Sequence, residues 1–184
     1  MFDQLIQKIK SDNENRERFH DAFKVTEVSS KAILLHEGEI SNQIYLIKKG
    51  CLRMWFNKDG KDITIQFFFE GQAVASIDSF LSNQPSMFTL ECVENSEILS
   101  ISKSDFEQLH QIYPELKDGF YEMIFQRFRN YAHLFLSRIK DTPQERYMDL
   151  IKNHPDIIKR VPQHYIASYL GITPVSLSRI RNRR

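Results

Sequence analysis

The sequence predicts an α+β protein in which a β-rich region is followed by one long helix and a group of short helices. Short β-rich runs separated by turn residues fill the chain from about Ser30 to Ser102. Helical periodicity with few turn residues then begins near Glu115. The charge of the last residues also differs in sign from the rest. We therefore expect three units, at residues 1–113, 114–140 and 141–184.

The composition is that of an ordinary globular protein. Hydrophobic residues make up 41% of the 184 residues and charged residues 27%, so the chain can bury a core. No apolar run approaches the roughly 18–20 residues needed to cross a bilayer, and the N-terminus lacks the continuous apolar core of a signal peptide. We expect a cytoplasmic protein with no membrane segment.

The first 113 residues combine one helix with a set of strands. Apolar residues recur at helical intervals from Phe2 to Ile9, which predicts an amphipathic helix. The β-rich runs that follow are KAILLHEGE, NQIYLIKKG, CLRMWFNKDGK, DITIQFFFEGQ, MFTLECVENS and EILSIS. Turn residues close these runs, four of them glycines, at positions 38, 50, 60 and 71. This spacing predicts an all-β sandwich or barrel rather than alternating βαβ units.

The two cysteines do not indicate a disulfide framework or a metal site. Cys51 and Cys92 lie 41 positions apart, with neither a CxxC motif nor a paired histidine. We expect both to be buried, reduced thiols.

The helical region begins with a short helix that we expect Ser104 to cap, and a long helix starts at Pro114. About 25 residues up to Ile139 contain no further turn cluster after Gly119, which corresponds to roughly 37 Å of helix. Its apolar residues cover an arc of about 160°, with Phe125 and Leu136 outside it: Leu116, Phe120, Met123, Ile124, Phe128, Tyr131, Leu134, Phe135 and Ile139.

This arc is wider than one packing surface requires. A helix that contacts its own β domain on one side and a second copy on the other would use all of it, which predicts a homodimer. The alternative is a central helix buried between the two domains of a monomer. After this helix, Thr142 precedes Pro143 and Glu145 and predicts a capped helix that ends near Pro155. The segment DIIKRVP is expected to be a linker.

The end of the chain is strongly basic. After Asp156 the only charged residues are six basic ones. The rest of the chain contains 25 − 6 = 19 basic residues and all 24 acidic ones, so residues 1–158 carry a net charge of −5. Charge separation of this kind predicts a basic contact surface for a negatively charged partner.

The same segment has the pattern of two short helices joined by a tight turn. Gly171 is suited to a left-handed helix end, and Thr173 followed by Pro174 starts a second helix with Leu177 and Ile180 on its buried side. Hydroxyl, amide and guanidinium side chains predominate on the opposite side, where they can contact phosphates and base edges: Val175, Ser176, Ser178, Arg179, Asn182 and Arg183. We predict a helix-turn-helix that binds double-stranded DNA.

From Ser30 onward the chain resembles transcription regulators of the cyclic-AMP receptor protein and fumarate–nitrate regulator (Crp/Fnr) superfamily. The resemblance rests on the HEGE turn, the run IYLIKKGCLRMW, the long helix and TPVSLSRI. It implies a β-roll effector domain of the cyclic-nucleotide-binding jelly-roll type, a dimerising central helix and a C-terminal helix-turn-helix. Such regulators read roughly palindromic operators and can contact RNA polymerase. On this match Thr173 caps the recognition helix, Ser176 contacts phosphate or base, and Arg179 reads guanine.

The chain departs from the superfamily in two places. Relatives that bind cyclic AMP use a Gly-Glu and an Arg-Ser pair, whereas Ala75-Ser76 and Ser86-Met87 stand there in this chain. A cyclic phosphate without its arginine loses its main charge-assisted contact, so we expect no tight binding of cyclic AMP or cyclic GMP. The pocket then holds either another, unidentified effector, lined by Ser76, Asp78, Ser86 and Met87 together with aromatic residues of the long helix, or no effector.

The second departure is the end of the chain at Arg184, where relatives continue into a β-hairpin wing. The wing is either lost or missing from a truncated sequence.

Other functions have weaker support. The six histidines are scattered with no HxH pair, which argues against a metal-dependent enzyme of the cupin type, and no GxSxG motif is present. We therefore expect neither enzymatic activity nor a metal site. A heme sensor would need His36 or His133 as an axial ligand, and no CxxCH motif is present. The main alternative is a ligand-sensing module whose tail docks on an acidic protein rather than on DNA.

Overall fold

The computed structural model describes residues 2–12 and 21–182. Two four-stranded antiparallel sheets form the β domain, one in the order β1-β8-β3-β6 and the other in the order β2-β7-β4-β5. The strands are β1 (Phe23–Val28), β2 (Ile33–Leu35), β3 (Gln43–Lys49), β4 (Leu52–Lys58), β5 (Lys61–Phe68), β6 (Ala73–Val74), β7 (Thr89–Cys92) and β8 (Ser96–Ser102). The short helix α2 (Ile77–Ser82) lies between β6 and β7.

The interior of the β domain is apolar, as the alternation of its strands requires. Ile47, Leu52, Phe68 and Leu90 are fully buried in one cluster that both sheets contribute to. The predicted sandwich is therefore confirmed. Cys92 belongs to the same cluster, and both cysteines are buried and free, as expected.

Glycine is required at two of the predicted turns. Asp59 and Gly60 both have positive φ in the β4–β5 hairpin, the conformation that an Asp-Gly pair favours. Gly50 has φ +110°, and a Cβ atom there would lie 2.1 Å from the Ser96 hydroxyl oxygen. A side chain at this position would collide with β8.

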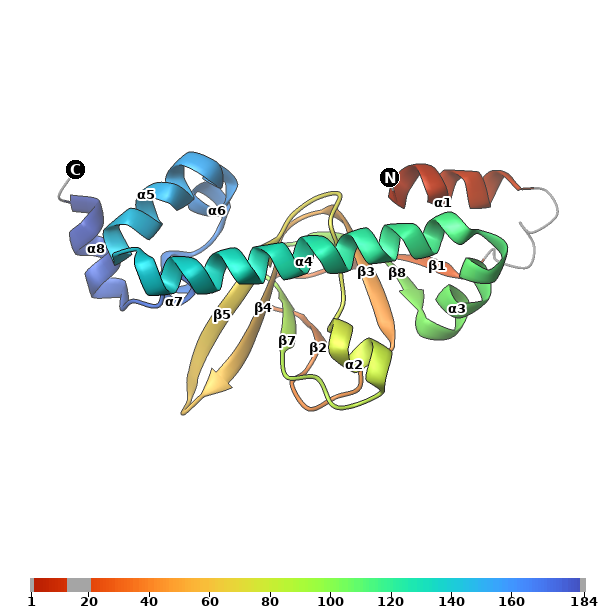
Figure 1. Cartoon of the computed structure of the whole chain (residues 1–184), viewed down its shortest axis with the longest axis horizontal. Helices are drawn as coiled ribbons and strands as arrows, with labels where there is room; N and C mark the ends of the chain where they lie inside the picture. The colour runs from red at the N-terminus through yellow and green to blue at the C-terminus, as the bar shows by residue number, and fades with distance from the viewer. Residues whose placement is uncertain (1, 13–20, 183–184) are drawn as a thin grey trace.

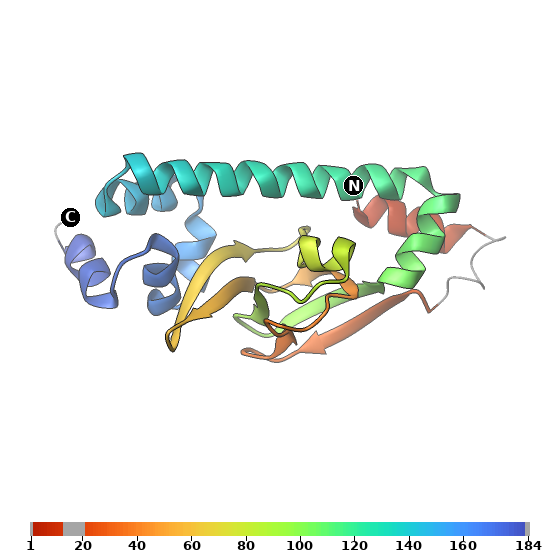
Figure 2. The same cartoon turned by 60° about the horizontal axis from the view of Figure 1, so that its bottom comes forward.

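The long helix α4 (Pro114–Lys140) lies along the β domain and extends past it toward the C-terminal helices (Figures 1 and 2). Pro114 occupies its first turn, as predicted. At one end, α4 packs with α1 (Phe2–Ser11) and α3 (Lys103–Ile112). Leu116, Phe120 and Met123 of α4 are buried in this cluster. One side of α4 thus belongs to the core of its own chain.

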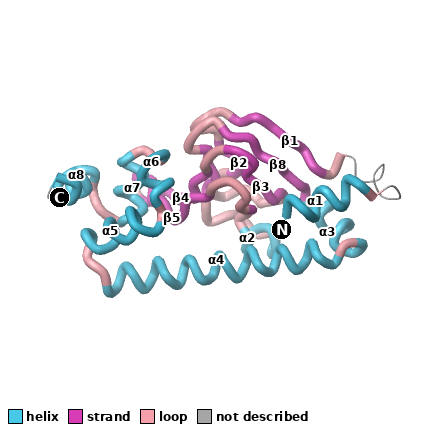
Figure 3. Tube along the Cα trace, turned by 90° about the horizontal axis from the view of Figure 1, so that it is seen from above, coloured by secondary structure: helices cyan, strands magenta, loops and turns pink. Residues whose placement is uncertain are grey.

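Four short helices lie at the other end of α4 (Figure 3). They are α5 (Pro143–Asn153), α6 (Pro155–Arg160), α7 (Gln163–Leu170) and α8 (Pro174–Asn182). The predicted capping box of α5 is present, because Thr142 and Glu145 each bond to the backbone of the other. The core of these helices also includes Cys51, Phe67 and Val93 of the β domain. The C-terminal helices therefore pack directly on the sandwich.

Three local predictions were wrong. Ser102, not Ser104, caps α3, because its side chain accepts a hydrogen bond from the Asp105 amide. The segment DIIKRVP is not an extended linker: most of it forms α6, which Pro155 starts. β1 precedes the predicted start of the β region near Ser30, and its four central residues are exposed.

Candidate nucleic-acid interface

The helices α7 and α8 are joined by a three-residue turn. Gly171 has φ +70° and ends α7 in the left-handed conformation, as predicted. Two arginines bind the last carbonyl groups of α7: Arg138 of α4 donates to Tyr169 O at 2.7 Å, and Arg146 of α5 donates to Leu170 O at 3.0 Å. These bonds fix the turn between the helices to the C-terminal end of α4.

The helix α8 has one buried side and one exposed side. Thr173 caps it, because its hydroxyl oxygen accepts a hydrogen bond from the Ser176 amide at 3.1 Å. Leu177 is 1% exposed, and Ile180 packs against the same core. Of the predicted contact residues, Ser176 is half-buried and the others that the structure describes are exposed: Thr173, Val175, Ser178, Arg179 and Asn182. The predicted contact residue Arg183 lies outside the described residues.

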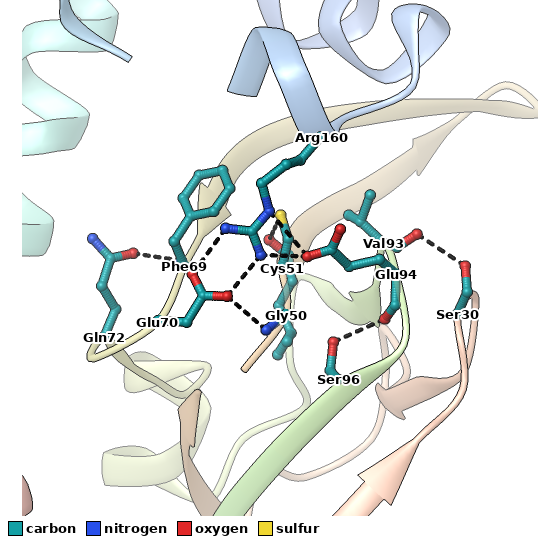
Figure 4. A network of polar contacts seen from close by, with 11 residues as sticks. Ser30, Gly50, Cys51, Phe69, Glu70, Gln72, Val93, Glu94, Ser96 and Arg160 are labelled. Carbon is teal, nitrogen blue, oxygen red and sulfur yellow. Dashed lines mark hydrogen bonds and ion pairs between the residues drawn. The ribbon is translucent and has the colours of Figure 1, made fainter. Parts of the chain in front are cut away.

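An arginine anchors the C-terminal helices to the β domain (Figure 4). Arg160, at the end of α6, donates to both carboxylate oxygens of Glu70, at 2.7 and 2.9 Å, and also bonds to Glu94. These bonds lower the pKa of Glu70 to about 2 and raise the pKa of Arg160 above its ordinary value. The Gly50 amide also donates to the Glu70 carboxylate, at 2.8 Å. We call Arg160, Glu70 and Glu94 the Arg160 clamp.

A second anchor is almost fully buried. Arg53 of β4 is 2% exposed and donates to Glu91 of β7 at 2.7 Å from Nη2 and 3.1 Å from Nε. The ring of Tyr165 in α7 lies 3.7 Å from the Arg53 guanidinium carbon, and its hydroxyl donates to Glu91 at 3.2 Å. On the same face, the Ser168 hydroxyl donates to Asp62 O and accepts from the Thr64 amide. The helix α7 is thus tied to the β4–β5 hairpin by polar contacts at two successive turns.

The four residues predicted to line an effector pocket do not converge. Ser76 and Ser86 are each 3% exposed, and their hydroxyl oxygens lie 2.8 Å apart. Asp78 and Met87 are exposed, Met87 by 58%, so they do not share the buried surroundings of the two serines, and the four-residue lining stays a prediction. The reason is that α2 and the loop before β7 turn these two side chains outward. Within the described residues, no arginine or lysine hydrogen-bonds to the Ser76 or Ser86 side chain.

A metal site, a heme site and a membrane-spanning helix are the other possibilities considered from the sequence. Residues 2–12 and 21–182 contain no group of three or more His, Cys, Asp and Glu side chains placed to hold a metal ion. His36 and His133, the candidate heme ligands, are both exposed and lie on different units, the loop after β2 and α4. In the described part of the chain, no helix is both long and apolar enough to cross a membrane.

Residues 25–113 match the family model of the cyclic nucleotide-binding domain. Over 88 residues, the chain is 26% identical to the cAMP-activated global transcriptional regulator CRP of Salmonella typhimurium. The chain carries a cyclic nucleotide-binding domain over these residues. This confirms the resemblance that the sequence motifs indicated.

The fold of this Crp/Fnr-like protein extends the similarity beyond the β domain. A variant of CooA from Carboxydothermus hydrogenoformans has a TM-score of 0.74 at 17% identity, over 97% of this chain and 83% of that one. FixK2 from Bradyrhizobium japonicum has a TM-score of 0.75 at 16% identity, over 88% of this chain and 83% of that one. The arrangement of β domain, long helix and C-terminal helices is therefore that of Crp/Fnr-family structures.

The chain spans only part of the curated relatives that it matches. The match to CRP covers 47% of this chain and 42% of CRP. A match to the lysophospholipase NTE1 of Coccidioides immitis, at 26% identity, covers 84% of this chain and 9% of that protein. The similarity to NTE1 is limited to a small part of that enzyme.

Sequence reasoning missed the residues that hold the units together. Arg53 stands inside the apolar run CLRMWF, and a charged residue in a buried strand requires a partner. That signal indicates a buried pair, but it cannot identify Glu91, which is 38 residues away, or Tyr165. The sequence places Arg160 on a basic contact surface, whereas in the structure it is bound to Glu70 and Glu94.

Proposed function

We propose that this Crp/Fnr-like protein is a sequence-specific DNA-binding regulator that acts as a homodimer, with α7 and α8 as the helix-turn-helix. The observation that carries the proposal is the division of α8 into a buried side, at Leu177, and an exposed side with Val175, Ser178, Arg179 and Asn182. No acidic residue lies in the first turn of α8, and Arg179 and Arg181 lie in its last turn. A helix of this kind fits the major groove, where arginine can bond to guanine in two places.

Selection of duplexes from a random library tests this proposal, with Arg179→Ala as the variant and Arg181→Ala as the matched control. Both arginines are exposed on α8, but Arg179 lies opposite the buried Leu177, and Arg181 lies closer to the buried side. We expect the wild type to enrich an inverted repeat. Arg179→Ala should weaken the free energy of binding to the selected site by about 1–3 kcal/mol and should lose selectivity at one base pair. Arg181→Ala should weaken binding to all DNA sequences by a similar factor. Equal enrichment by wild type and Arg179→Ala would contradict the assignment.

The dimer proposal rests on a stripe of exposed apolar residues along α4. The residues of the stripe are separated by four, three, seven and four positions, which is compatible with the seven-residue repeat of a coiled-coil seam. Its side chains are about half to two-thirds exposed: Tyr121, Phe125, Phe128, Phe135 and Ile139, with Leu136 at its edge. Phe125 and Leu136, outside the arc drawn from the sequence, thus lie on the exposed side. A second copy of α4 would cover this stripe.

Sedimentation at micromolar concentration tests the dimer. Phe128→Glu places a charge in the middle of the stripe and should give a monomer, because a buried seam cannot solvate a carboxylate. Gln126→Glu adds the same single negative charge on another face of the same helix, so it should leave the dimer intact. A wild-type chain that sediments as a monomer would overturn the dimer proposal.

We further propose that the cyclic nucleotide-binding domain does not respond to cyclic AMP. The buried Ser86 hydroxyl bonds to the Ser76 hydroxyl and to the Phe88 backbone, and no arginine or lysine among the described residues hydrogen-bonds to either serine side chain, as pairing with a cyclic phosphate would need. We expect isothermal calorimetry with cyclic AMP to give a dissociation constant weaker than micromolar. A micromolar or tighter constant would contradict this.

A further inference from the structure

The end of α4 meets the end of α7 beside the proposed helix-turn-helix. Only Asp141 and Thr142 lie between α4 and α5, and Figure 3 shows α5, α7 and α8 gathered at this end of α4. The exposed apolar stripe of α4 runs up to Ile139, which is 69% exposed and follows Arg138 directly in the chain. We call Arg138, Arg146 and the carbonyl groups that they bind the α4–α7 corner. It lies at the end of the proposed dimer seam.

The last carbonyl groups of α7 are divided between two kinds of donor. An α-helix leaves its last four carbonyls without partners inside the helix, and in α7 they belong to residues 167–170. Amides of the turn that follows α7 donate to the first two. The last two accept hydrogen bonds from Arg138, at 2.7 Å, and from Arg146, at 3.0 Å. The end of α7 is therefore completed by side chains of α4 and α5.

Arg146 joins the end of α4 to the end of α7. Its Nη1 donates to Asp141 O at 2.6 Å, and its Nη2 donates to Leu170 O at 3.0 Å. Asp141 ends α4, and Leu170 is the last residue of α7. A guanidinium group is planar and holds its donors in a rigid fork, so two bonds from one group fix the positions of both acceptors. Backbone carbonyls cannot change rotamer to follow a displaced donor.

Arg138 packs directly against the turn between α7 and α8. Gly171 has φ +70°, and a Cβ atom there would lie 2.7 Å from Nη1 of Arg138 and 3.3 Å from its Cζ. A rotation of α7 at the corner would therefore either press the turn into this guanidinium or break its bond to Tyr169 O. The helix α8 begins at Pro174, only three residues after Gly171, so α8 is held by the same contact.

The two arginines are not held there by ion pairs. In the described parts of the chain, no carboxylate pairs with Arg138 or Arg146. The partial negative charge at the helix ends compensates them instead. Burial and the nearby charge of Arg146 lower the pKa of Arg138, as expected for two cations held close together. What these side chains provide is a fixed geometry between α4 and α7.

We propose that Arg138 and Arg146 are positioning residues that fix α8 relative to α4 and thereby set the spacing between the two half-sites of the bound DNA. This inference rests on the proposed function, because it needs two copies of α8 joined through a seam along α4. In such a dimer, the separation of the recognition helices determines the separation of the half-sites. One base pair advances the duplex by about 3.4 Å. A small displacement of α8 at the corner therefore misaligns it with its half-site, although neither arginine contacts DNA.

The test compares binding to a single half-site with binding to inverted repeats of that half-site at different spacings. We expect the wild type to bind its preferred repeat at least about tenfold more tightly than a repeat lengthened or shortened by one base pair. Arg138→Met/Arg146→Met removes the bonds to α7 and should reduce this preference to about threefold or less. Binding of the variant to the single half-site should stay within about twofold of the wild type, because α8 keeps its own contact residues.

Three further variants separate positioning from a general loss of structure or charge. Lys152→Met removes an exposed cation in the last turn of the same helix as Arg146 and should keep the spacing preference. Arg138→Met alone should lose part of the preference, and it replaces the double variant if that one does not fold, because Arg138 is exposed. Arg138→Lys retains a charged donor for Tyr169 O and should restore the preference.

The outcomes distinguish this inference from the proposed function. A wild-type protein that binds no inverted repeat overturns the proposed function, and the positioning role with it. A wild type that prefers one spacing, with the same preference in Arg138→Met and in the double variant, overturns the positioning role alone. The positioning role is also wrong if the double variant weakens the single half-site as much as the repeat, because the arginines would then act on DNA or on α8 itself.

Discussion

The buried pair of Arg53 and Glu91 allows a quantitative test of how α7 is held on the β domain. The side chains are 2% and 7% exposed, and Glu91 accepts two hydrogen bonds from Arg53 and one from Tyr165. We consider Arg53→Met, which keeps most of the buried volume and removes the charge. The carboxylate of Glu91 is then left in the core with only the Tyr165 hydroxyl to solvate it.

The expected cost follows from that unpaired charge. Removing one partner of a buried ion pair destabilises a protein by about 3–5 kcal/mol. Because the Tyr165 bond remains, we expect the lower end, about 3 kcal/mol in the free energy of unfolding. For a chain of this size that corresponds to a fall of about 6–12 °C in the melting temperature. The double variant Arg53→Met/Glu91→Leu removes both buried charges. It leaves without its partner only Asp62, which accepts a bond from Arg53 at 2.8 Å but is 39% exposed, so this variant should return to within about 1 kcal/mol of the wild type.

Urea unfolding followed by circular dichroism measures these differences. Arg129→Met is the control, because Arg129 is exposed and such a change should alter the free energy of unfolding by at most about 0.5 kcal/mol. The reasoning is refuted if Arg53→Met costs less than about 1 kcal/mol, or if the double variant is as unstable as the single one.

Two further predictions concern titrating groups. Arg160 lowers the pKa of Glu70 to about 2, so this pair stabilises the fold fully above the ordinary glutamate pKa near 4.5, and the contribution is lost as the pH falls from there toward 2. Arg160→Ala should flatten this part of the pH profile of urea unfolding, and an unchanged profile would contradict the role of the clamp. Burial raises the pKa of Cys51 to about 12, so only about one molecule in ten thousand carries the thiolate at pH 8. Iodoacetamide should therefore modify Cys51 only after unfolding, and rapid alkylation of the native protein would show that the thiol is accessible.

The elements of this fold that depend on local chemistry were predictable from the sequence. Pro114, Thr142 and Gly171 set the start of α4, the start of α5 and the end of α7, because each satisfies a backbone requirement within a few residues. The buried and exposed sides of α8 followed from helical spacing alone. The strand β1 was missed: it lies at the edge of its sheet, and its pairing with β8 joins two distant parts of the chain, which the sequence alone does not indicate.

The candidate sites were less predictable, because they depend on residues far apart in the chain. The hydrogen bond between the Ser76 and Ser86 hydroxyls was not predicted, and the exposure of Asp78 and Met87 depends on the course of α2 and the next loop. The burial of Arg127 also had no sequence signal, since an arginine between apolar residues in a long helix is usually solvated. Only the packing of α4 on β5 and β6 buries it.

The charge of the C-terminal segment also needs the structure for its interpretation. The sequence assigns all six basic residues after Asp156 to one surface, but Arg160 is bound in the clamp by Glu70 and Glu94, whereas Lys159, Arg179 and Arg181 are exposed. If the proposed DNA binding is correct, only the free cations release counterions from the duplex.

This difference predicts distinct salt dependences for two arginine variants. Arg181→Ala should reduce the slope of log K against log salt concentration by about 0.9 for each phosphate that the variant no longer neutralises, and Arg160→Ala should leave the slope unchanged. Filter binding between about 50 and 200 mM salt separates the two variants. An equal reduction in both would mean that the Arg160 clamp opens when the protein binds DNA, because only a released guanidinium can contact a phosphate.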